Sequence, residues 1–185
     1  MFIQTEATPN PATLKFLPGD IVLEAGTADF PSPESASASP LARRIFAVEG
    51  VIGVFLGNDF ITVTKADLTE WDHVKPPILG AIMEHFASGD PAVEDGSALP
   101  GHAEHTGPDA EVVGQIKQLL DTRVRPAVAQ DGGDITFHGF DQGVVYLHMQ
   151  GACAGCPSST LTLKMGIENL LRHYIPEVTE VRPVA

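Results

Sequence analysis

The sequence is poor in basic residues and in cysteine, and it lacks long apolar runs. Of its 185 residues, 11 are Lys or Arg and 24 are Asp or Glu, which gives a formal net charge of −13. Nucleic-acid phosphates and anionic lipid repel a chain this acidic, which argues against both as general partners. The sequence contains no run of eighteen apolar residues that could cross a membrane, and its first residues lack the basic start of a signal peptide. We therefore expect a globular protein with no nucleic-acid partner, no membrane partner and no targeting segment.

Two cysteines are too few for the disulfide framework of a small secreted domain. They form the motif Cys153-Ala154-Gly155-Cys156. In a reducing compartment this CxxC spacing is typical of a metal site or of a dithiol redox site. The spacing alone favours neither of the two.

A change of composition divides the chain at residues 89–109. This stretch contains four Gly, three Pro and five acidic residues without one Lys or Arg. The composition predicts a flexible acidic linker that would span about 25 Å as a coil. We therefore expect an α/β (α+β) protein of two small domains, residues 1–88 and residues 110–185, joined by this linker.

Residues 1–88 show the patterns of short strands and two helices. Alternating apolar residues and turn residues predict strands at residues 2–5, 14–17, 21–23, 51–56 and 60–65. Ser39 followed by Pro40 is typical of a helix start, and Gly50 would end that helix. Residues 31–40, rich in Pro and Ser, are expected to be a loop. A second helix is expected after the two prolines at 76–77, where apolar residues recur at helical spacing.

Residues 110–185 predict the order helix, strand, strand, cysteine motif, helix, strand. The first helix carries Val112, Ile116 and Leu119 on one face, and Pro126 breaks it. The second helix begins at about Pro157. Strands are expected at residues 135–140, 144–149 and 178–182. This order places the cysteine motif at the junction of a strand and a helix.

This junction suits sulfur chemistry. Cys156 falls at or beside the N-cap of the helix that begins at Pro157, where unpaired amides and the helix dipole favour thiolate over thiol. Thiolates select zinc, copper(I) or iron–sulfur clusters over hard cations, and they also suit a redox disulfide. One chain supplies two thiolates, whereas a tetrahedral zinc or a four-iron cluster usually takes four. A two-fold dimer that joins two CxxC loops would complete such a site.

The residues around the cysteines also carry a family resemblance. The core of the motif reads GACAGCPSSTLTLKMGIE, at residues 151–168. It closely resembles the C-terminal domain of NifU and of Nfu-type iron–sulfur cluster scaffold or carrier proteins, and the match covers nearly all of residues 108–183. Residues 2–88, which open with FIQTEATPNPATLKFLPG, resemble the N-terminal domain that accompanies it in Nfu proteins.

The resemblance implies a scaffold or carrier that is not an enzyme. It implies one [4Fe–4S] cluster per homodimer, held by Cys153 and Cys156 of both subunits. Upstream assembly proteins would donate the cluster, and apo iron–sulfur enzymes would accept it. The expected compartment is the cytoplasm of a bacterium, or the mitochondrial matrix if this is a mature eukaryotic chain.

Two alternative functions stay open beside this one. The first is a thiol–disulfide oxidoreductase, although no thioredoxin-like βαβ unit precedes the motif and no aromatic residue precedes Cys153. The second is a structural dimer linked by zinc, because thiolates bind zinc equally well.

Other groups that could carry chemistry have structural interpretations. His102 and His105 look like a ligand pair, but they lie in the acidic linker and are expected to be solvated. Asp131 and Asp134 flank a Gly-Gly pair, which is typical of a turn. The serines at 158–159 lack the surroundings of a nucleophile and are expected to donate or accept hydrogen bonds at the helix start.

Overall fold

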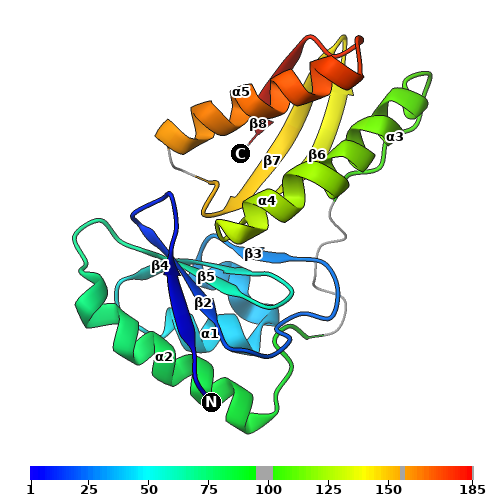
Figure 1. The fold of residues 1–185 in the computed structure, drawn as a ribbon. Helices are drawn as coiled ribbons and strands as arrows, with labels where there is room; N and C mark the ends of the chain where they lie inside the picture. The colour runs from blue at the N-terminus through cyan, green and yellow to red at the C-terminus, as the bar shows by residue number, and fades with distance from the viewer. Residues whose placement is uncertain (95–101, 155–156, 185) are drawn as a thin grey trace. The chain divides into compact units, whose positions relative to one another are not determined.

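The computed structural model describes residues 1–94, 102–154 and 157–184, and the side chains of the last helix from residue 161 onward. The chain divides into two compact units, residues 1–100 and residues 101–185 (Figure 1). Each unit has a hydrophobic core of its own. The expected α+β class is confirmed. None of the helices in the described residues is both long and apolar enough to span a membrane.

Unit 1 contains a five-stranded antiparallel sheet in the order β1-β2-β5-β4-β3. The strands are β1 (Gln4–Ala7), β2 (Thr13–Leu17), β3 (Ala28–Phe30), β4 (Val51–Leu56) and β5 (Ile61–Lys65). β4 and β5 form the predicted hairpin, with Leu56 opposite Ile61. Apolar side chains from the strands, such as Phe16 and Val63, are fully buried in the core of the unit.

Two α-helices and one 3-10 helix complete the part of unit 1 that the structure describes. They are η1 (Pro33–Ala38), α1 (Pro40–Phe46) and α2 (Trp71–Ser88). Ser39 begins α1 as predicted, since Ala42 N donates to its hydroxyl at 3.0 Å and Pro40 occupies the first helical position. α1 and α2 contact each other, and Ile45 and Ile78 are fully buried between them and the sheet.

Residues 21–23 are not the predicted strand. Val22 N and Leu23 N both donate to Asn58 O, at 2.7 and 3.1 Å, so this segment is a loop anchored to the β4–β5 turn. The third strand is instead β3, which is too short to show an alternating pattern. The predicted loop at residues 31–40 contains η1.

Helix α2 begins earlier than predicted. It starts at Trp71, and the two prolines at 76–77 lie inside it. Prolines remove two backbone donors, which is why the sequence suggested a helix start there. Tertiary contacts outweigh this loss: Val74 is buried in the core, and Trp71 Nε1 donates to Pro11 O at 3.1 Å.

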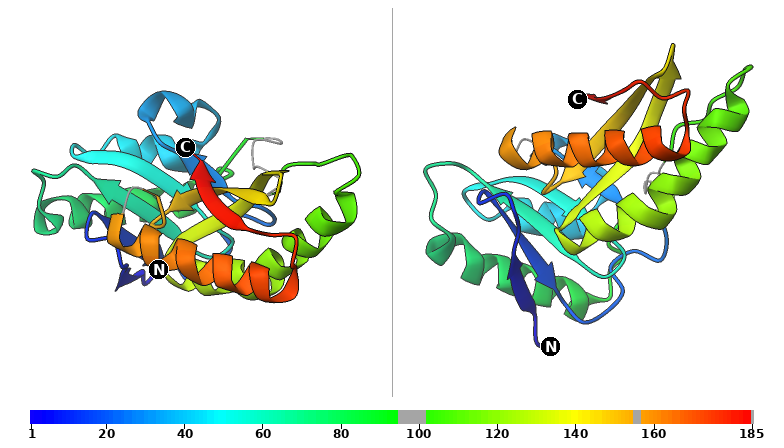
Figure 2. Two further views of the ribbon diagram at one scale, coloured as in Figure 1. Left: turned by 90° about the horizontal axis from the view of Figure 1, so that it is seen from above. Right: turned by 45° about the horizontal axis from the view of Figure 1, so that its top comes forward.

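Unit 2 contains a three-stranded sheet in the order β6-β7-β8. β6 (Gly133–Asp141) and β7 (Val144–Gly151) are antiparallel, and β8 (Glu180–Val184) is parallel to β7. The helices are α3 (Ala110–Leu119), η2 (Leu120–Val124), α4 (Arg125–Gln130) and α5 (Pro157–Tyr174). They lie along one face of the sheet (Figure 2). The predicted order of elements around the cysteine motif is confirmed.

The first helical segment of unit 2 does not end at Pro126 as predicted. A π-helical turn, η2, connects α3 to α4, and Pro126 lies in the first turn of α4. Proline has no N–H for the preceding turn and clashes with its carbonyl, which a wider π turn accommodates. Val113, Ile116 and Leu120 are the buried residues of this segment, and the predicted Val112 and Leu119 are partly buried and pack against the same core.

The described ends of the predicted linker pack against the two units. Glu94 N donates to Ala38 O at 2.7 Å in unit 1, and Ala103 N donates to Phe137 O at 2.8 Å in unit 2. A coil free along residues 89–109 would not make these bonds. Residues 95–101 lie outside the described part of the chain, and the domain limits at 88 and 110 remain predictions.

Candidate functional site

Cys153 lies in a turn between β7 and α5. β7 ends at Gly151, whose φ of 64° lies in the left-handed region that glycine adopts without strain. Ala152 N donates to Gly132 O at 3.2 Å, and Ala154 N donates to Gly151 O at 3.1 Å. The first bond ties the turn to the residue before β6, and the second closes the turn itself. Cys153 is 7% exposed and belongs to the hydrophobic core of unit 2.

Gly133, the first residue of β6, makes room for the thiol. A Cβ at this position would lie 2.5 Å from Cys153 Sγ, 3.0 Å from Gln150 O and 3.1 Å from Cys153 N. A real Cβ does not approach a sulfur atom so closely, so a side chain here would displace the turn. The sequence assigned the Gly-Gly pair to a turn, and the structure adds that Gly133 forms one wall of the cysteine site.

Helix α5 follows this turn and begins at Pro157, as predicted. No acidic residue occurs in its first turn, so no carboxylate opposes the positive end of its dipole. Cys156 lies outside the described residues, and so do the side chains of the serines at 158–159. The structure therefore places one of the two predicted ligands, and the ligand role of both cysteines stays a prediction.

Asp134 is a structural ion-pair residue beside the cysteine turn. Arg125 Nε donates to Asp134 Oδ1 at 2.8 Å, and Arg125 Nη2 donates to Oδ2 at 2.9 Å. The side chain of Asp134 is 5% exposed. Its hydrogen bonds raise the pKa of Arg125, so the guanidinium stays charged. These two hydrogen bonds join α4 to β6, so Asp134 has a structural role.

The prediction that His102 is solvated is wrong. Its Nε2 lies 2.8 Å from Asp121 Oδ1, and Phe137 N donates to its Nδ1 at 2.8 Å, so the side chain is only 11% exposed. His105 packs edge-on against the ring of Phe137. Partial burial alone would raise the pKa of Asp121, but hydrogen bonds from Arg125 and His102 outweigh it and lower that pKa.

Cys153 has no ready-made metal site around it in the described part of the chain. Within residues 1–94, 102–154 and 157–184, no three His, Cys, Asp or Glu side chains are arranged to hold a metal ion. A site with three or more such ligands at Cys153 would need residues from outside these ranges. Cys156 and a second subunit are the sources that the sequence offers.

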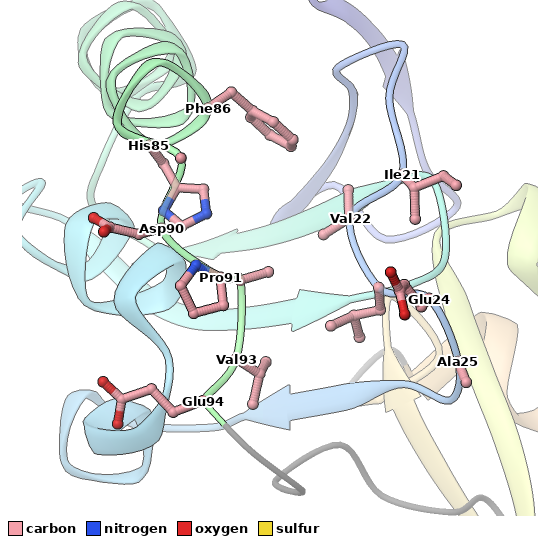
Figure 3. Close-up of a pocket in the computed structure, with 13 residues that line it drawn as sticks. Ile21, Val22, Glu24, Ala25, His85, Phe86, Asp90, Pro91, Val93 and Glu94 are labelled. Carbon is pink, nitrogen blue, oxygen red and sulfur yellow. The ribbon is translucent and has the colours of Figure 1, made fainter.

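Unit 1 contains a pocket of about 510 Å³ that the sequence did not indicate. The loop at residues 21–25 and residues 89–94 line opposite sides of this pocket, and His85 and Phe86, near the end of α2, line one end of it (Figure 3). His85 is 2% exposed, and its Nδ1 has no hydrogen-bond partner among the described residues. Burial, helped by the charge of Arg44, lowers the pKa of His85. The imidazole is therefore neutral at pH 7.

Comparison with known proteins identifies the family. The model described as "Scaffold protein Nfu/NifU N terminal" matches residues 3–89, and the "NifU-like domain" model matches residues 116–182. The human protein named "NFU1 iron-sulfur cluster scaffold homolog, mitochondrial" is 54% identical over 185 residues, which cover 100% of this chain and 72% of that protein. This chain belongs to the Nfu family.

Other Nfu relatives agree. "NifU-like protein 4, mitochondrial" from Arabidopsis thaliana is 54% identical over 186 residues, and the chain spans 98% of its own length and 65% of that protein. The solution NMR structure of the NifU-like protein from Saccharomyces cerevisiae aligns at a TM-score of 0.45 with 28% identity, over 51% of this chain and 86% of that one. The family models and the sequence relatives confirm the resemblance inferred from the cysteine motif.

Proposed function

We propose that this Nfu chain is an iron–sulfur cluster scaffold and carrier that binds a [4Fe–4S] cluster through Cys153 and Cys156 and passes it to apo-proteins. The observation that carries the proposal is the position of Cys153, in the β7–α5 turn of the NifU-like domain. The name of the human relative, an iron-sulfur cluster scaffold homolog, supports it.

The surroundings of Cys153 suit a soft inorganic cargo. Gly133 leaves the backbone of β6 close to the thiol, Gly151 turns the chain with a positive φ, and Ala152 adds only a methyl group. The positive end of α5 favours the thiolate form that a cluster requires. The ion pair of Arg125 and Asp134 holds β6 against α4 and so fixes one wall of the site.

The number of thiolates supports a dimer. One chain has two cysteines, and a four-iron cluster takes four thiolates, so two copies related by a two-fold axis complete the site. A cluster held at such an interface is released when the subunits separate. This behaviour suits delivery of a cluster better than electron transfer, and it requires no catalytic residue.

The proposed partners follow from this role. Upstream assembly proteins donate the cluster, and apo iron–sulfur enzymes accept it. Unit 1 has no cysteine, and residues 1–88 carry 5 basic and 11 acidic side chains, so we assign it recognition of the acceptor. The mitochondrial names of the relatives favour the mitochondrial matrix over the bacterial cytoplasm as the compartment.

Anaerobic reconstitution with iron and sulfide tests the cluster. We expect about four iron and four sulfide per dimer and the spectrum of a cubane cluster. Cys153→Ala should abolish iron binding and shift the protein toward monomer. Ala154→Ser, in the same turn, is the matched control and should keep both.

Three results would contradict the proposal. They are a full iron content in Cys153→Ala, two irons in each monomer, or tightly bound zinc that iron and sulfide cannot replace. The oxidoreductase alternative demands that the wild type catalyse reduction of insulin disulfides and that Cys153→Ala abolish this activity.

A further inference from the structure

The pocket beside His85 adjoins a second recess in unit 1. The second recess, of about 580 Å³, is lined by residues of β1, the end of β2 and two loops, and Ile21 lines both hollows. Phe2, at the edge of the second recess, is 80% exposed, and Ile21 is 60% exposed. Large apolar side chains that are exposed together beside two recesses are typical of an interaction surface and not of an ordinary solvated face.

The first pocket is preformed. The loop at residues 21–25 is held by Asn58, whose backbone oxygen accepts two hydrogen bonds and whose side-chain amide donates to Leu23 O at 2.7 Å. The opposite wall is held by Ser39, whose hydroxyl donates to Ala92 O at 2.5 Å, and by the bond from Glu94 N. Walls fixed on both sides spare a ligand the entropic cost of ordering them.

His85 forms part of the wall of this pocket. It is almost completely buried, and its Nδ1 has no partner among the described residues. A buried polar atom left without a hydrogen bond costs free energy. Because Nδ1 has almost no accessible surface, a ligand in the pocket meets other atoms of the ring, which form an apolar part of the wall.

The charged side chains that line the two recesses are all acidic. Five carboxylates line the two recesses, and among the described residues no Lys or Arg lines either one. Arg44 neutralises Asp90 at 2.8 Å and Arg43 lies 3.6 Å from Glu94. The remaining three, Asp20, Glu24 and Asp59, have no ion-pair partner in the part of the chain that the structure describes. Such a rim attracts cationic ligands and repels acidic ones.

We propose that the two recesses bind one extended segment of a partner protein, with apolar side chains in the hollows and Lys or Arg on the acidic rim. Alternate side chains of an extended segment point to the same side, so one segment can fill both hollows. This inference rests on the recognition role proposed for unit 1 and names the chemistry of the recognised partner.

Selection of random 12-residue peptides displayed on phage against the full-length chain tests the proposal. We expect enriched peptides to be apolar and net positive. A synthetic peptide of the enriched sequence should bind about tenfold more weakly to Ile21→Ser, which removes one buried aliphatic contact. Glu24→Lys should weaken binding by a similar factor and reduce its salt dependence.

Matched controls separate this surface from the rest of unit 1. Leu68→Ser and Asp67→Lys change fully or largely exposed residues outside both recesses and should bind the peptide as the wild type does. Enrichment of acidic peptides, absence of any enriched peptide, or equal losses in the pocket and control variants would overturn the proposal. These measurements use no iron, so their failure leaves cluster binding untouched, and a failed reconstitution leaves the peptide result standing.

Discussion

At the scale of single residues, the buried imidazole of His85 makes the stability of unit 1 depend on pH. Its pKa in the folded unit is lowered by burial first and by Arg44 second. As the pH falls below the ordinary value of about 6.5, the unfolded chain takes up a proton that the folded unit resists. Stability is therefore full above that pH and declines as the pH falls toward the lowered pKa.

His85→Leu should remove this dependence. At pH 7.5 we expect a gain of about 1 kcal/mol, because the variant no longer buries an unpartnered nitrogen. Between pH 7.5 and 5.5 it should lose less stability than the wild type. Urea unfolding followed by Trp71 fluorescence measures unit 1 alone, since Trp71 is the single tryptophan. His73→Leu, an exposed change on the same helix, should keep the wild-type pH profile, and a similar profile for His85→Leu would refute the assignment.

Gly133 leads to a prediction about the cysteine site. Gly133→Ala should destabilise unit 2 by about 1–3 kcal/mol, because the new methyl group overlaps Cys153 Sγ. Displacement of the turn should also speed alkylation of Cys153 by iodoacetamide, which peptide mass spectrometry can follow. Gly114→Ala, whose methyl group meets no atom within 4 Å, is the control and should be neutral or slightly stabilising in α3. Unchanged alkylation of Gly133→Ala would show that the turn has room for a side chain.

At the scale of elements, the pair of Arg125 and Asp134 joins α4 to β6. Asp134→Asn removes the more buried of the two carboxylate charges that this partly buried guanidinium faces, the other being Asp121 at 3.0 Å, and should cost about 3 kcal/mol. Asp131→Asn, three residues earlier and exposed, should change stability by less than about 0.5 kcal/mol. Hydrogen exchange of the β6 amides separates the two variants. Equal protection in both would mean that the ion pair contributes nothing to holding β6.

Elements with local signals were predictable from the sequence. Ser39-Pro40 marked the start of α1, and the residues around Pro157 marked the start of α5, because capping depends on immediate neighbours. The early start of α2 at Trp71 was not predictable, since the contact with Pro11 that supports it spans 60 residues of sequence. Tertiary packing overrides local propensity in such segments.

At the candidate site, too, local features were predictable from the sequence and contacts between distant residues were not. The strand-to-helix position of Cys153 followed from the order of local patterns. Its burial against Gly133 did not, because that contact depends on how β6 lies beside the turn. His102 was misjudged for a related reason: its partners, Asp121 and Phe137, lie 19 and 35 residues away in the sequence. The pocket at His85 arises from two stretches, residues 21–25 and 85–94, that no sequence pattern links.

At the scale of the whole molecule, each unit is supported by its own core. The buried core residues of unit 1 lie between residues 3 and 82, and those of unit 2 lie between residues 113 and 181. No residue belongs to both cores. Separate cores predict separate folding. We therefore expect residues 107–185 to fold and keep the cluster, and residues 1–88 to fold without iron.

The contacts of His102 and Ala103 predict that the fragment 107–185 is less stable than the fragment 102–185. The shorter fragment loses the bond between Ala103 N and Phe137 O, the bond from Phe137 N to His102 Nδ1 and the contact of His102 with Asp121. At about 0.5–1.5 kcal/mol for each of these three hydrogen bonds, we expect a loss of about 1.5–4.5 kcal/mol. Tyrosine fluorescence during urea unfolding measures it, since both tyrosines lie in unit 2 and these fragments lack Trp71.

Substitution within the longer fragment separates these contacts from mere chain length. His102→Leu in fragment 102–185 should reproduce most of the loss, whereas Glu104→Gln, an exposed change two residues on, should not. Iron content after reconstitution should be the same in all four proteins, because every cysteine remains. If the two fragments unfold at the same urea concentration, residues 102–106 do not pack against β6 in solution. They would then be part of the linker.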